Sequence, residues 1–470
     1  MQRKPSVVVV ASCIVLTAVA GEPQIMRANH PGAPVCRSAD YDGNPNGPWE
    51  KGRIAAGADF NVRDFGAKGD GTTKDTAALQ SAINACSEKG GGRVVLSSGT
   101  FLSGAIQLKS GVELRIVKDA RLLASPDIAD FPDWNAKHVV TANCPRGRSA
   151  SFIFADECEN IAITGEGVID GNGETHVRRK SDPNWSGWEF ERILPMGGSL
   201  PRVVFLAGCR NVRLEGVSLV NGPAGWGFWI HDCDRVAVRG LTIRSDVRYP
   251  NNDGLHVNCS RDVDISGCDI ECGDDALVVR ANSRSLKENK PCERVHVRDC
   301  RVRSWASGVR VGWCCDGVIR DCSFRRIAMR DTVNGIDIVM PPMPNNPDYG
   351  REATRIEDIL FEDIEMDGLY AHPLDAKVEG DPDVTRVDFV RRITLRRVRA
   401  TGLELPNIRG RKDTPFRDFL FEDCAFRRVS DEELPGWERH GAANIGRTRP
   451  ARFEHAEGFR LVRTEGWTIK

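Results

Sequence analysis

Three aspartates in two short polar segments carry the strongest chemical signal in this sequence. Asp253 lies within Tyr249–Gly254, and Asp274 and Asp275 lie within Glu271–Ala276. If the fold brings them together, mutual repulsion keeps at least one carboxyl protonated beside ionised neighbours. Hydrolysis of a glycosidic bond needs that division, because one carboxyl protonates the leaving oxygen while another activates water. The same residues could instead form turns or hold Ca²⁺, and the pattern alone leaves all three interpretations open.

An internal repeat supplies the elements that would position these aspartates. Its clearest copies begin at Asn211, Arg235, Asp262 and Arg294, each with two runs of alternating apolar residues around a small or polar corner. Alternation with period two predicts short strands, and Gly, Asp or Asn at the corners supplies the turns. Strands recurring about every 22–30 residues, without helical patterns between them, predict a parallel β-helix. The two acidic segments would then lie on adjacent coils, about 5 Å apart along the axis.

A helix is predicted at the N-terminal end of this solenoid. The segment from Lys74 to Ser87 places Leu79, Ile83 and Cys86 on one face, and three glycines follow it. A solenoid must close its end with an atypical element, and an amphipathic helix suits that role. We therefore expect an N-terminal capping helix.

Cysteine usage follows the repeat. The chain has 16 cysteines, and most of them recur at equivalent positions of successive copies, where small polarizable side chains stack in the interior. We expect most of them to be packing residues. The better candidates for disulfides are Cys314 with Cys315, and Cys268 with Cys272.

The first residues predict export. Two basic residues precede an apolar run from Val7 to Ala20 that ends in a small-residue cleavage pattern, which is typical of a secretory signal peptide. We expect a signal peptide over residues 1–20, an irregular leader over 21–58 and a single all-β domain, the parallel β-helix, over 59–470. The protein would then be secreted, either extracellular or periplasmic.

The charge balance limits the classes of partner. The chain has 65 Lys+Arg and 66 Asp+Glu, a net charge of −1, without the basic excess of a nucleic-acid or anionic-membrane binder. No later segment reaches the ~20 apolar residues that a spanning helix needs. We expect no nucleic-acid partner, no membrane partner and a monomer.

Several motifs resemble glycoside hydrolase family 28, the polygalacturonase family of right-handed parallel β-helix enzymes. The opening Asn61–Asp75 is similar to the start of many pectin-acting β-helices, and Gly99–Lys109 and Gly167–Gly173 are similar to family 28 itself. The motifs Asn-x-Asp at Asn251–Asp253 and Gly-Asp-Asp at Gly273–Asp275 are more specific. The resemblance implies a hydrolase that cleaves a pectic or related plant polysaccharide or oligosaccharide by inverting single displacement, without a metal or other cofactor.

The resemblance also implies roles for single residues. Asp274 resembles the general acid, and Asp253 and Asp275 resemble the pair that holds and deprotonates the attacking water. Asn251 matches the motif's asparagine, which helps to order the site. Asn252 stands where the family usually has threonine.

Two substrate-binding motifs depart from the family pattern. Ser307 replaces the supporting histidine, and Asp337 and Val339 replace the arginine and lysine that grip a galacturonate carboxylate. Arg310 and Arg280 are candidate replacements for these cations, whereas Asp337 would repel a uronate. The sequence therefore favours a neutral or deoxy sugar at the cleavage point over galacturonate.

Further candidates for a substrate cleft lie near the aspartates. Trp226 and Trp229 precede the coil of Asp253 and could stack on sugar rings or fill a loop, and His256 is either part of the cleft or a satisfied strand histidine. The insertion 174–201 would border the cleft. Two other classes stay open: a polysaccharide lyase on the same fold, which would need Ca²⁺ and a base beside a uronate, and a non-catalytic glycan-binding β-helix.

Overall fold

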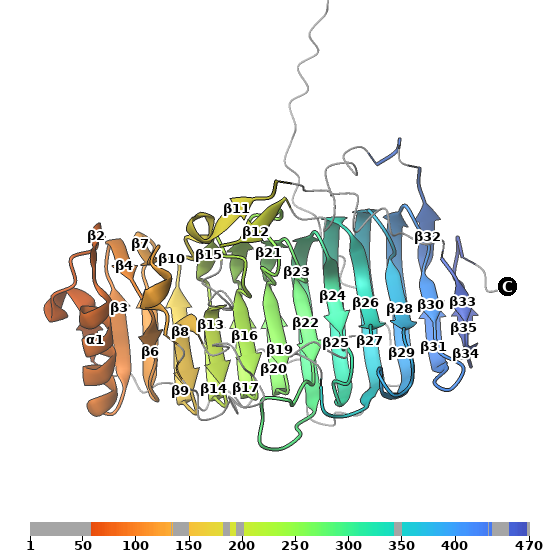
Figure 1. Cartoon of the computed structure of the whole chain (residues 1–470), viewed down its shortest axis with the longest axis horizontal. Helices are drawn as coiled ribbons and strands as arrows, with labels where there is room; N and C mark the ends of the chain where they lie inside the picture. The colour runs from red at the N-terminus through yellow and green to blue at the C-terminus, as the bar shows by residue number, and fades with distance from the viewer. Residues whose placement is uncertain are drawn as a thin grey trace, which may run out of the picture. The chain divides into compact units, whose positions relative to one another are not determined.

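The computed structural model describes residues 58–132, 134, 150–181, 189–193, 202–342, 350–430, 432–434 and 451–467. The described strands stack as the parallel coils of a β-helix (Figure 1), which confirms the fold predicted from the repeat. The expected signal peptide and the leader up to residue 57 lie outside the described residues. No helix within the described ranges is long and apolar enough to cross a membrane.

Two parallel sheets, which we call sheet A and sheet B, form the walls of the coils. In sheet A, pairs of short strands in the early coils merge into the single long strands β23, β25, β27 and β29, of 13 to 16 residues, and divide again at β31 and β32. A separate antiparallel hairpin consists of β11 (Val177–Arg179) and β12 (Phe190–Arg192). Sheet B contains β5 (Ile106–Gln107), β8 (Ser151–Asp156), β13 (Arg202–Ala207), β16 (Phe228–His231), β19 (Leu255–Asn258), β22 (Leu277–Arg280), β24 (Ser307–Val311), β26 (Asn334–Met340), β28 (Leu374–Val378), β30 (Asn407–Arg409) and β33 (Phe453–Glu454). Sheet A contains β1 (Asp59–Asn61), β2 (Asp70–Lys74), β3 (Gly92–Leu96), β4 (Gly99–Ser103), β6 (Val112–Ile116), β7 (Ala120–Ala124), β9 (Glu159–Gly165), β10 (Val168–Asp170), β14 (Arg210–Glu215), β15 (Ser218–Val220), β17 (Asp234–Arg239), β18 (Thr242–Arg244), β20 (Arg261–Ser266), β21 (Asp269–Cys272), β23 (Cys292–Ser304), β25 (Val318–Thr332), β27 (Thr354–Leu369), β29 (Val387–Gly402), β31 (Phe416–Glu422), β32 (Ala425–Arg428), β34 (Ala456–Glu457) and β35 (Arg460–Val462).

The repeat sets the register of the coils. Val212, Val236, Val263 and Val295 occupy the same position in the four clearest copies and are direct partners on β14, β17, β20 and β23. All four are at most 3% exposed. A slip of one residue would turn this apolar column outward, so burial fixes the stacking that places later residues beside one another.

The first residue of each copy lies at a coil corner in the left-handed backbone region. Asn211, Arg235, Asp262 and Arg294 have φ values of 56°, 58°, 56° and 54°. Asparagine and aspartate tolerate this conformation better than arginine does. Each arginine donates from Nε to the residue on the coil before it, Arg235 to Asn211 and Arg294 to Asp262, both at 2.6 Å. Hydrogen bonds between coils therefore stabilise the corners.

The predicted capping helix forms at the N-terminal end of the coils as α1 (Thr76–Glu88) (Figure 1). Leu79, Ile83 and Cys86 are buried, as the periodicity predicts. Its contacts are with the 3₁₀ turn η2 (Val62–Phe65) and with β1, β3, β5 and β6. Glycines with positive φ follow the helix and end it, beginning with Gly90 at 91°.

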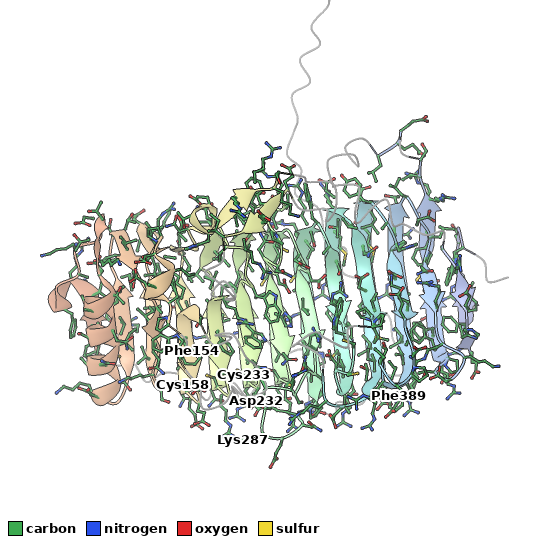
Figure 2. The ribbon with its side chains drawn as sticks, in the orientation of Figure 1. Phe154, Cys158, Asp232, Cys233, Lys287 and Phe389 are labelled. Atoms are coloured by element: carbon green, nitrogen blue, oxygen red, sulfur yellow. The ribbon has the colours of Figure 1, made fainter. Side chains whose placement is uncertain are left out.

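The thirteen cysteines within the described residues are buried and free. The Cys209 thiol is hydrogen-bonded to the thiols of Cys158 and Cys233, and these bonds together with burial raise its pKa well above the ordinary value. Cys158 and Cys233 are labelled along one edge of the coils in Figure 2. The packing role is confirmed. The expectation of disulfides at Cys314–Cys315 and Cys268–Cys272 is wrong, because these buried thiols are free.

Candidate active site

The three aspartates lie at the starts of two neighbouring strands of sheet B. Asp253 comes two residues before β19, and Asp274 and Asp275 come three and two residues before β22. The strands pair in parallel, and the backbone N–H of Gly254 donates to the Asp275 carbonyl at 3.0 Å. The fold therefore brings the two acidic segments onto adjacent coils, with the chain of the next coil at Ser307 beside them.

Asp275 is held by two side chains from the next strand. One carboxylate oxygen accepts hydrogen bonds from the Ser307 backbone N–H at 3.2 Å and from the Ser307 hydroxyl, and the other accepts from Arg310 Nε. Arg310 also donates from Nη2 to Asp337 Oδ2 at 3.0 Å. Although burial opposes the charge of Arg310, Asp275 and Asp337 raise its pKa above the ordinary value. The one buried guanidinium of Arg310 therefore donates hydrogen bonds to two carboxyl groups.

Asp337 lies on β26 directly opposite Arg310 in the strand register. The Ser307 hydroxyl is 2.9 Å from its Oδ2. Burial raises the pKa of Asp337 to about 6 despite the opposing effect of Arg310. Position 337 therefore carries an acidic side chain and not a cationic one.

Asp274 is the most accessible of the three aspartates, because Asp253 and Asp275 are buried and Asp274 is only partly so. Asn251 donates to Asp274 Oδ2 from its backbone N–H and from Nδ2, both at 3.2 Å, and the Asp275 N–H donates to Oδ1 at 2.9 Å. Burial and the charge of Asp275 nevertheless raise the pKa of Asp274 to about 7. A proton is therefore available on this carboxyl near neutral pH.

Asp253 is buried next to His256. Its Oδ2 is 3.3 Å from His256 Nδ1, and its Oδ1 has no hydrogen-bond partner among the described residues. Burial, and then the charges of Asp274 and Asp275, raise the pKa of Asp253 well above the ordinary value. Burial, and then Arg280, lower the pKa of His256 far below its usual range, so that this imidazole is neutral.

An aromatic row on sheet B leads to the carboxylates. Phe154, Phe205, Trp229 and His256 are successive register partners on β8, β13, β16 and β19. Trp229 is stacked on Phe205 at a centroid distance of 4.2 Å and is 6% exposed. Trp226 stacks on His256 at 4.1 Å. Of the two tryptophans, Trp226 is the more exposed, and it is the one stacked on His256, which neighbours Asp253.

Two candidate binding residues are occupied elsewhere. Asn252 accepts from the Gly273 N–H at 2.6 Å and donates to the Asp246 carbonyl at 2.8 Å, so it braces the backbone of two coils. Arg280 forms a bidentate pair with Asp316 at 2.5 and 2.7 Å, and both are buried. The charges of Arg280 and Arg310 are therefore both matched by carboxylates within the fold.

Arg192 is a site residue that no sequence pattern indicated. It ends β12 within the insertion 174–201, and its Nη2 donates to Asn251 Oδ1. Burial lowers the pKa of Arg192, while Asp274 and then Asp253 act in the opposite direction. The hairpin is fixed nearby by Phe190, whose ring lies 5.0 Å from that of Tyr249. The sequence predicted that the insertion borders the cleft but carried no signal for this contact.

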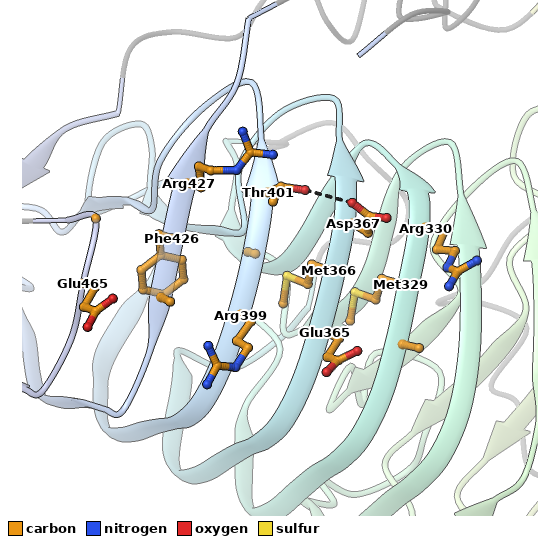
Figure 3. Close-up of a pocket in the computed structure, with 14 residues that line it drawn as sticks. Met329, Arg330, Glu365, Met366, Asp367, Arg399, Thr401, Phe426, Arg427 and Glu465 are labelled. Carbon is orange, nitrogen blue, oxygen red and sulfur yellow. Dashed lines mark hydrogen bonds between the residues drawn. The ribbon is translucent and has the colours of Figure 1, made fainter. Parts of the chain in front are cut away.

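A separate cavity of about 500 Å³ lies over late strands of sheet A and contains none of these residues (Figure 3). Met329, Met366 and Phe426 line its floor, and Thr401 donates to Asp367 at 3.1 Å. Its charged residues have both signs. The carboxylate cluster of Asp253, Asp274 and Asp275 therefore lies outside this cavity.

The described coils form a parallel β-helix with a carboxylate cluster on one wall, and the chain is similar to several known proteins. The model of "Glycosyl hydrolases family 28" matches residues 86–292. A "Probable polygalacturonase" of Vitis vinifera is 27% identical over 315 residues, 62% of this chain and 61% of that protein. An "Endo-polygalacturonase" of Pectobacterium carotovorum subsp. carotovorum is 30% identical over 217 residues, 46% of this chain and 53% of that protein. An exopolygalacturonase structure from Thermotoga maritima aligns with a TM-score of 0.68 and 23% identity, over 87% of this chain and 92% of that chain.

The fold is thus the right-handed parallel β-helix, and the resemblance seen in the sequence is confirmed. Over residues 86–292 the chain is similar to members of glycoside hydrolase family 28. It spans about three fifths of the length of the grape relative and about half of the bacterial one.

Proposed function

We propose that the protein is a secreted glycoside hydrolase that cleaves O-glycosidic bonds in a pectic or related plant polysaccharide or oligosaccharide. The observation that carries this proposal is the unequal environment of the three aspartates. Asp274 has a pKa raised to about 7, whereas Asp275 is tied to a guanidinium and a hydroxyl. Paired carboxyls whose environments differ in this way are suited to act as acid and base.

Asp274 is the general acid of this proposal. Its Oδ2 accepts two hydrogen bonds and its Oδ1 one, which leaves a lone pair of Oδ1 for the proton that is donated. Because Asp274 is more exposed than its neighbours, it can reach the oxygen of the leaving sugar. Protonation of that oxygen lets the glycosidic bond break as water attacks the anomeric carbon.

Asp253 and Asp275 hold the attacking water. The Oδ1 atom of Asp253 is buried and has no partner in the described part of the chain, so it can accept a hydrogen bond from water. Burial and the neighbouring carboxylates raise its pKa, so its carboxylate is a stronger base than that of an ordinary aspartate. Arg310 and Ser307 fix Asp275 and keep its charge in place. Direct attack by water gives a product of inverted configuration.

The sugar next to Asp337 is neutral or deoxy in this proposal. Arg310 and Arg280 bind Asp275, Asp337 and Asp316, so neither is free to pair with a uronate. A carboxylate at this end of the site would face the acidic Asp337 without a matched cation. Trp226, whose ring contacts the neutral His256 and the Arg202 guanidinium, is the partly exposed aromatic side chain for contact with a pyranose ring.

The substitution Asp274→Asn tests the proposal. It removes the transferable proton but keeps the shape of the side chain, so we expect the release of reducing ends to fall by about 10²–10⁴-fold with the fold and sugar binding retained. The measurement is a panel of pectic glycans and aryl glycosides, with the product anomer read by NMR. The matched control is Asp299→Asn, at an exposed corner where Asp299 binds Arg326, and it should keep full activity.

Other outcomes of the same panel would contradict the hydrolase. Unsaturated products that absorb in the ultraviolet and require Ca²⁺ would indicate a lyase. Glycan binding with no product from the unsubstituted protein, and no effect of Asp274→Asn, would indicate a binding protein. Retention of the anomeric configuration would contradict single displacement, even if hydrolysis occurs.

A further inference from the structure

The hydroxyl group of Ser307 lies between two buried carboxyl groups. It is hydrogen-bonded to Asp275 Oδ1, and its oxygen is 2.9 Å from Asp337 Oδ2 and 3.0 Å from Arg310 Nη2. A hydroxyl carries one proton and two lone pairs. The guanidinium is a donor and uses one lone pair, so the single proton of Ser307 can go to only one of the two carboxyl groups. If both were ionised, one carboxylate oxygen would face Ser307 Oγ without a proton between them.

The contacts of Asp337 do not compensate a negative charge on its carboxyl group. The side chain is buried, and its Oδ1 has no hydrogen-bond partner among the described residues. Its Oδ2 shares the Arg310 guanidinium with Asp275, so two carboxylates would face one cation. A proton on Asp337 removes both costs, because it leaves one negative charge beside one positive charge.

The strand on the other side of Asp337 adds to this preference. Asp375 on β28 is its register partner, and the charge of Lys377 on the same strand is paired with Asp375 at 2.9 Å. The strand of Asp337 itself, β26, carries no other charged residue. Burial raises the pKa of Asp337 to about 6. The charges of Asp375 and Asp275 act in the same direction, and Arg310 acts against them.

Only one oxygen of Asp337 has an acceptor for a proton. A proton on Oδ1 would have no partner in the described part of the chain, whereas a proton on Oδ2 faces Ser307 Oγ. The Ser307 oxygen would then accept hydrogen bonds from Asp337 and from Arg310. Its own proton would go to Asp275, and its one donor and two acceptor positions would all be used.

We propose that Asp337 is a positioning residue that acts in its protonated form. It donates from Oδ2 to Ser307 Oγ, and this contact directs the Ser307 hydroxyl to the carboxylate of Asp275. The inference rests on the proposed function, in which Asp275 helps to hold the attacking water. When Asp337 loses its proton, its carboxylate competes for the same hydroxyl, and Asp275 is held less firmly. The active site is thereby regulated by pH through a group that takes no part in bond cleavage.

Kinetics at pH 5 and pH 7 test this role with the best-cleaved glycan of the panel described above. Asp337→Asn is neutral at both pH values. Its kcat/KM relative to that of the unsubstituted protein should rise about 10-fold from pH 5 to pH 7, because ionised Asp337 takes a charge-assisted hydrogen bond from Asp275. When Asp337→Asn is added to Ser307→Ala, which lacks the hydroxyl, the corresponding rise should be below about 2-fold. Asp388→Asn, in an exposed pair with Arg355, is the control and should give the same ratio at both pH values.

Carboxyl titration by ¹³C NMR, with the aspartate γ-carbons labelled, tests the inference without a substrate. The resonance that is missing from Asp337→Asn should titrate with a midpoint at about pH 6 in the unsubstituted protein. The resonance that is missing from Asp275→Asn should shift at the same midpoint and lose that shift in Ser307→Ala. These results would support the proton relay even if no glycan is cleaved, which would contradict only the hydrolase. An Asp337 carboxyl that stays ionised down to pH 4, or a kinetic ratio that does not change with pH, would overturn the inference and leave the hydrolase standing.

Discussion

Replacing Arg310 with glutamine tests whether one cation holds the carboxylate cluster together. The guanidinium is 9% exposed and binds Asp275 and Asp337. Removing one partner of a buried ion pair costs about 3–5 kcal/mol, because it leaves an uncompensated charge. In this site, each carboxylate that loses the guanidinium can take up a proton instead of remaining buried with an uncompensated charge.

Proton uptake sets the size of the effect and its dependence on pH. Holding a carboxyl protonated costs about 1.4 kcal/mol for each pH unit above its ordinary pKa of about 3.9, hence about 4 kcal/mol at pH 7 and about 1.5 kcal/mol at pH 5. Asp337 already has a pKa of about 6 beside Arg310. Most of the free-energy cost of protonating Asp337 is therefore already present in the unsubstituted protein. The new cost falls mainly on Asp275. We expect the free energy of unfolding to drop by about 4–5 kcal/mol at pH 7 and about 1–2 kcal/mol at pH 5.

The sign of this dependence follows from the direction of the shift. A carboxyl whose pKa is higher in the folded than in the unfolded state destabilises the fold increasingly as pH rises above the unfolded value. Urea unfolding followed by circular dichroism at pH 5 and pH 7 measures the difference. Arg326→Gln, which removes an exposed pair with Asp299, should cost under about 1 kcal/mol at both pH values. A loss for Arg310→Gln that is equal at both pH values, or below about 1 kcal/mol at pH 7, would refute the shared-cation account.

Two further predictions concern protonation and thiol chemistry. Because Asp274 must carry its proton and has a pKa of about 7, kcat/KM measured from pH 4 to 9 should fall above about pH 7, and a rate that still rises at pH 9 would contradict its role as the acid. The thirteen described cysteines are buried, and burial raises the pKa of Cys86 to about 11 and that of Cys322 to about 12. Ellman's reagent should therefore detect at most three of the 16 cysteines in the native protein and the remainder only in urea, whereas fast labelling of more than three would contradict the stacked-thiol interior.

The sequence predicted the features that depend on spacing along the chain. The repeat placed Val212 and Val236 in register, and the same spacing put Asp253 and Asp274 on adjacent coils. It did not predict that Asn252 would turn inward to Gly273, because one residue of difference at a corner decides which face a side chain occupies. These choices depend on backbone angles that composition does not specify.

Contacts between segments that are distant along the chain also could not be predicted from the sequence. Arg192 reaches Asn251 because a hairpin folds back over the coils, and no periodicity encodes where an insertion will dock. Similarly, Arg280 was a candidate for binding substrate until the fold paired it with Asp316, 36 residues later. A charged residue becomes a binding group only when its own fold leaves it unmatched, and that is a property of the assembled coils.

The departure from the family pattern at Asp337 is coupled to Arg310. The two residues are direct partners on β24 and β26, and a single hydrogen-bonded pair joins them. An aspartate at 337 alone would bury a carboxylate beside Asp275 with nothing to compensate either. Arg310 supplies that compensation, so the cation of this region is bound to the protein rather than available to a substrate. The replacement of the uronate-binding cation by Asp337 therefore does not imply that the site is catalytically inactive.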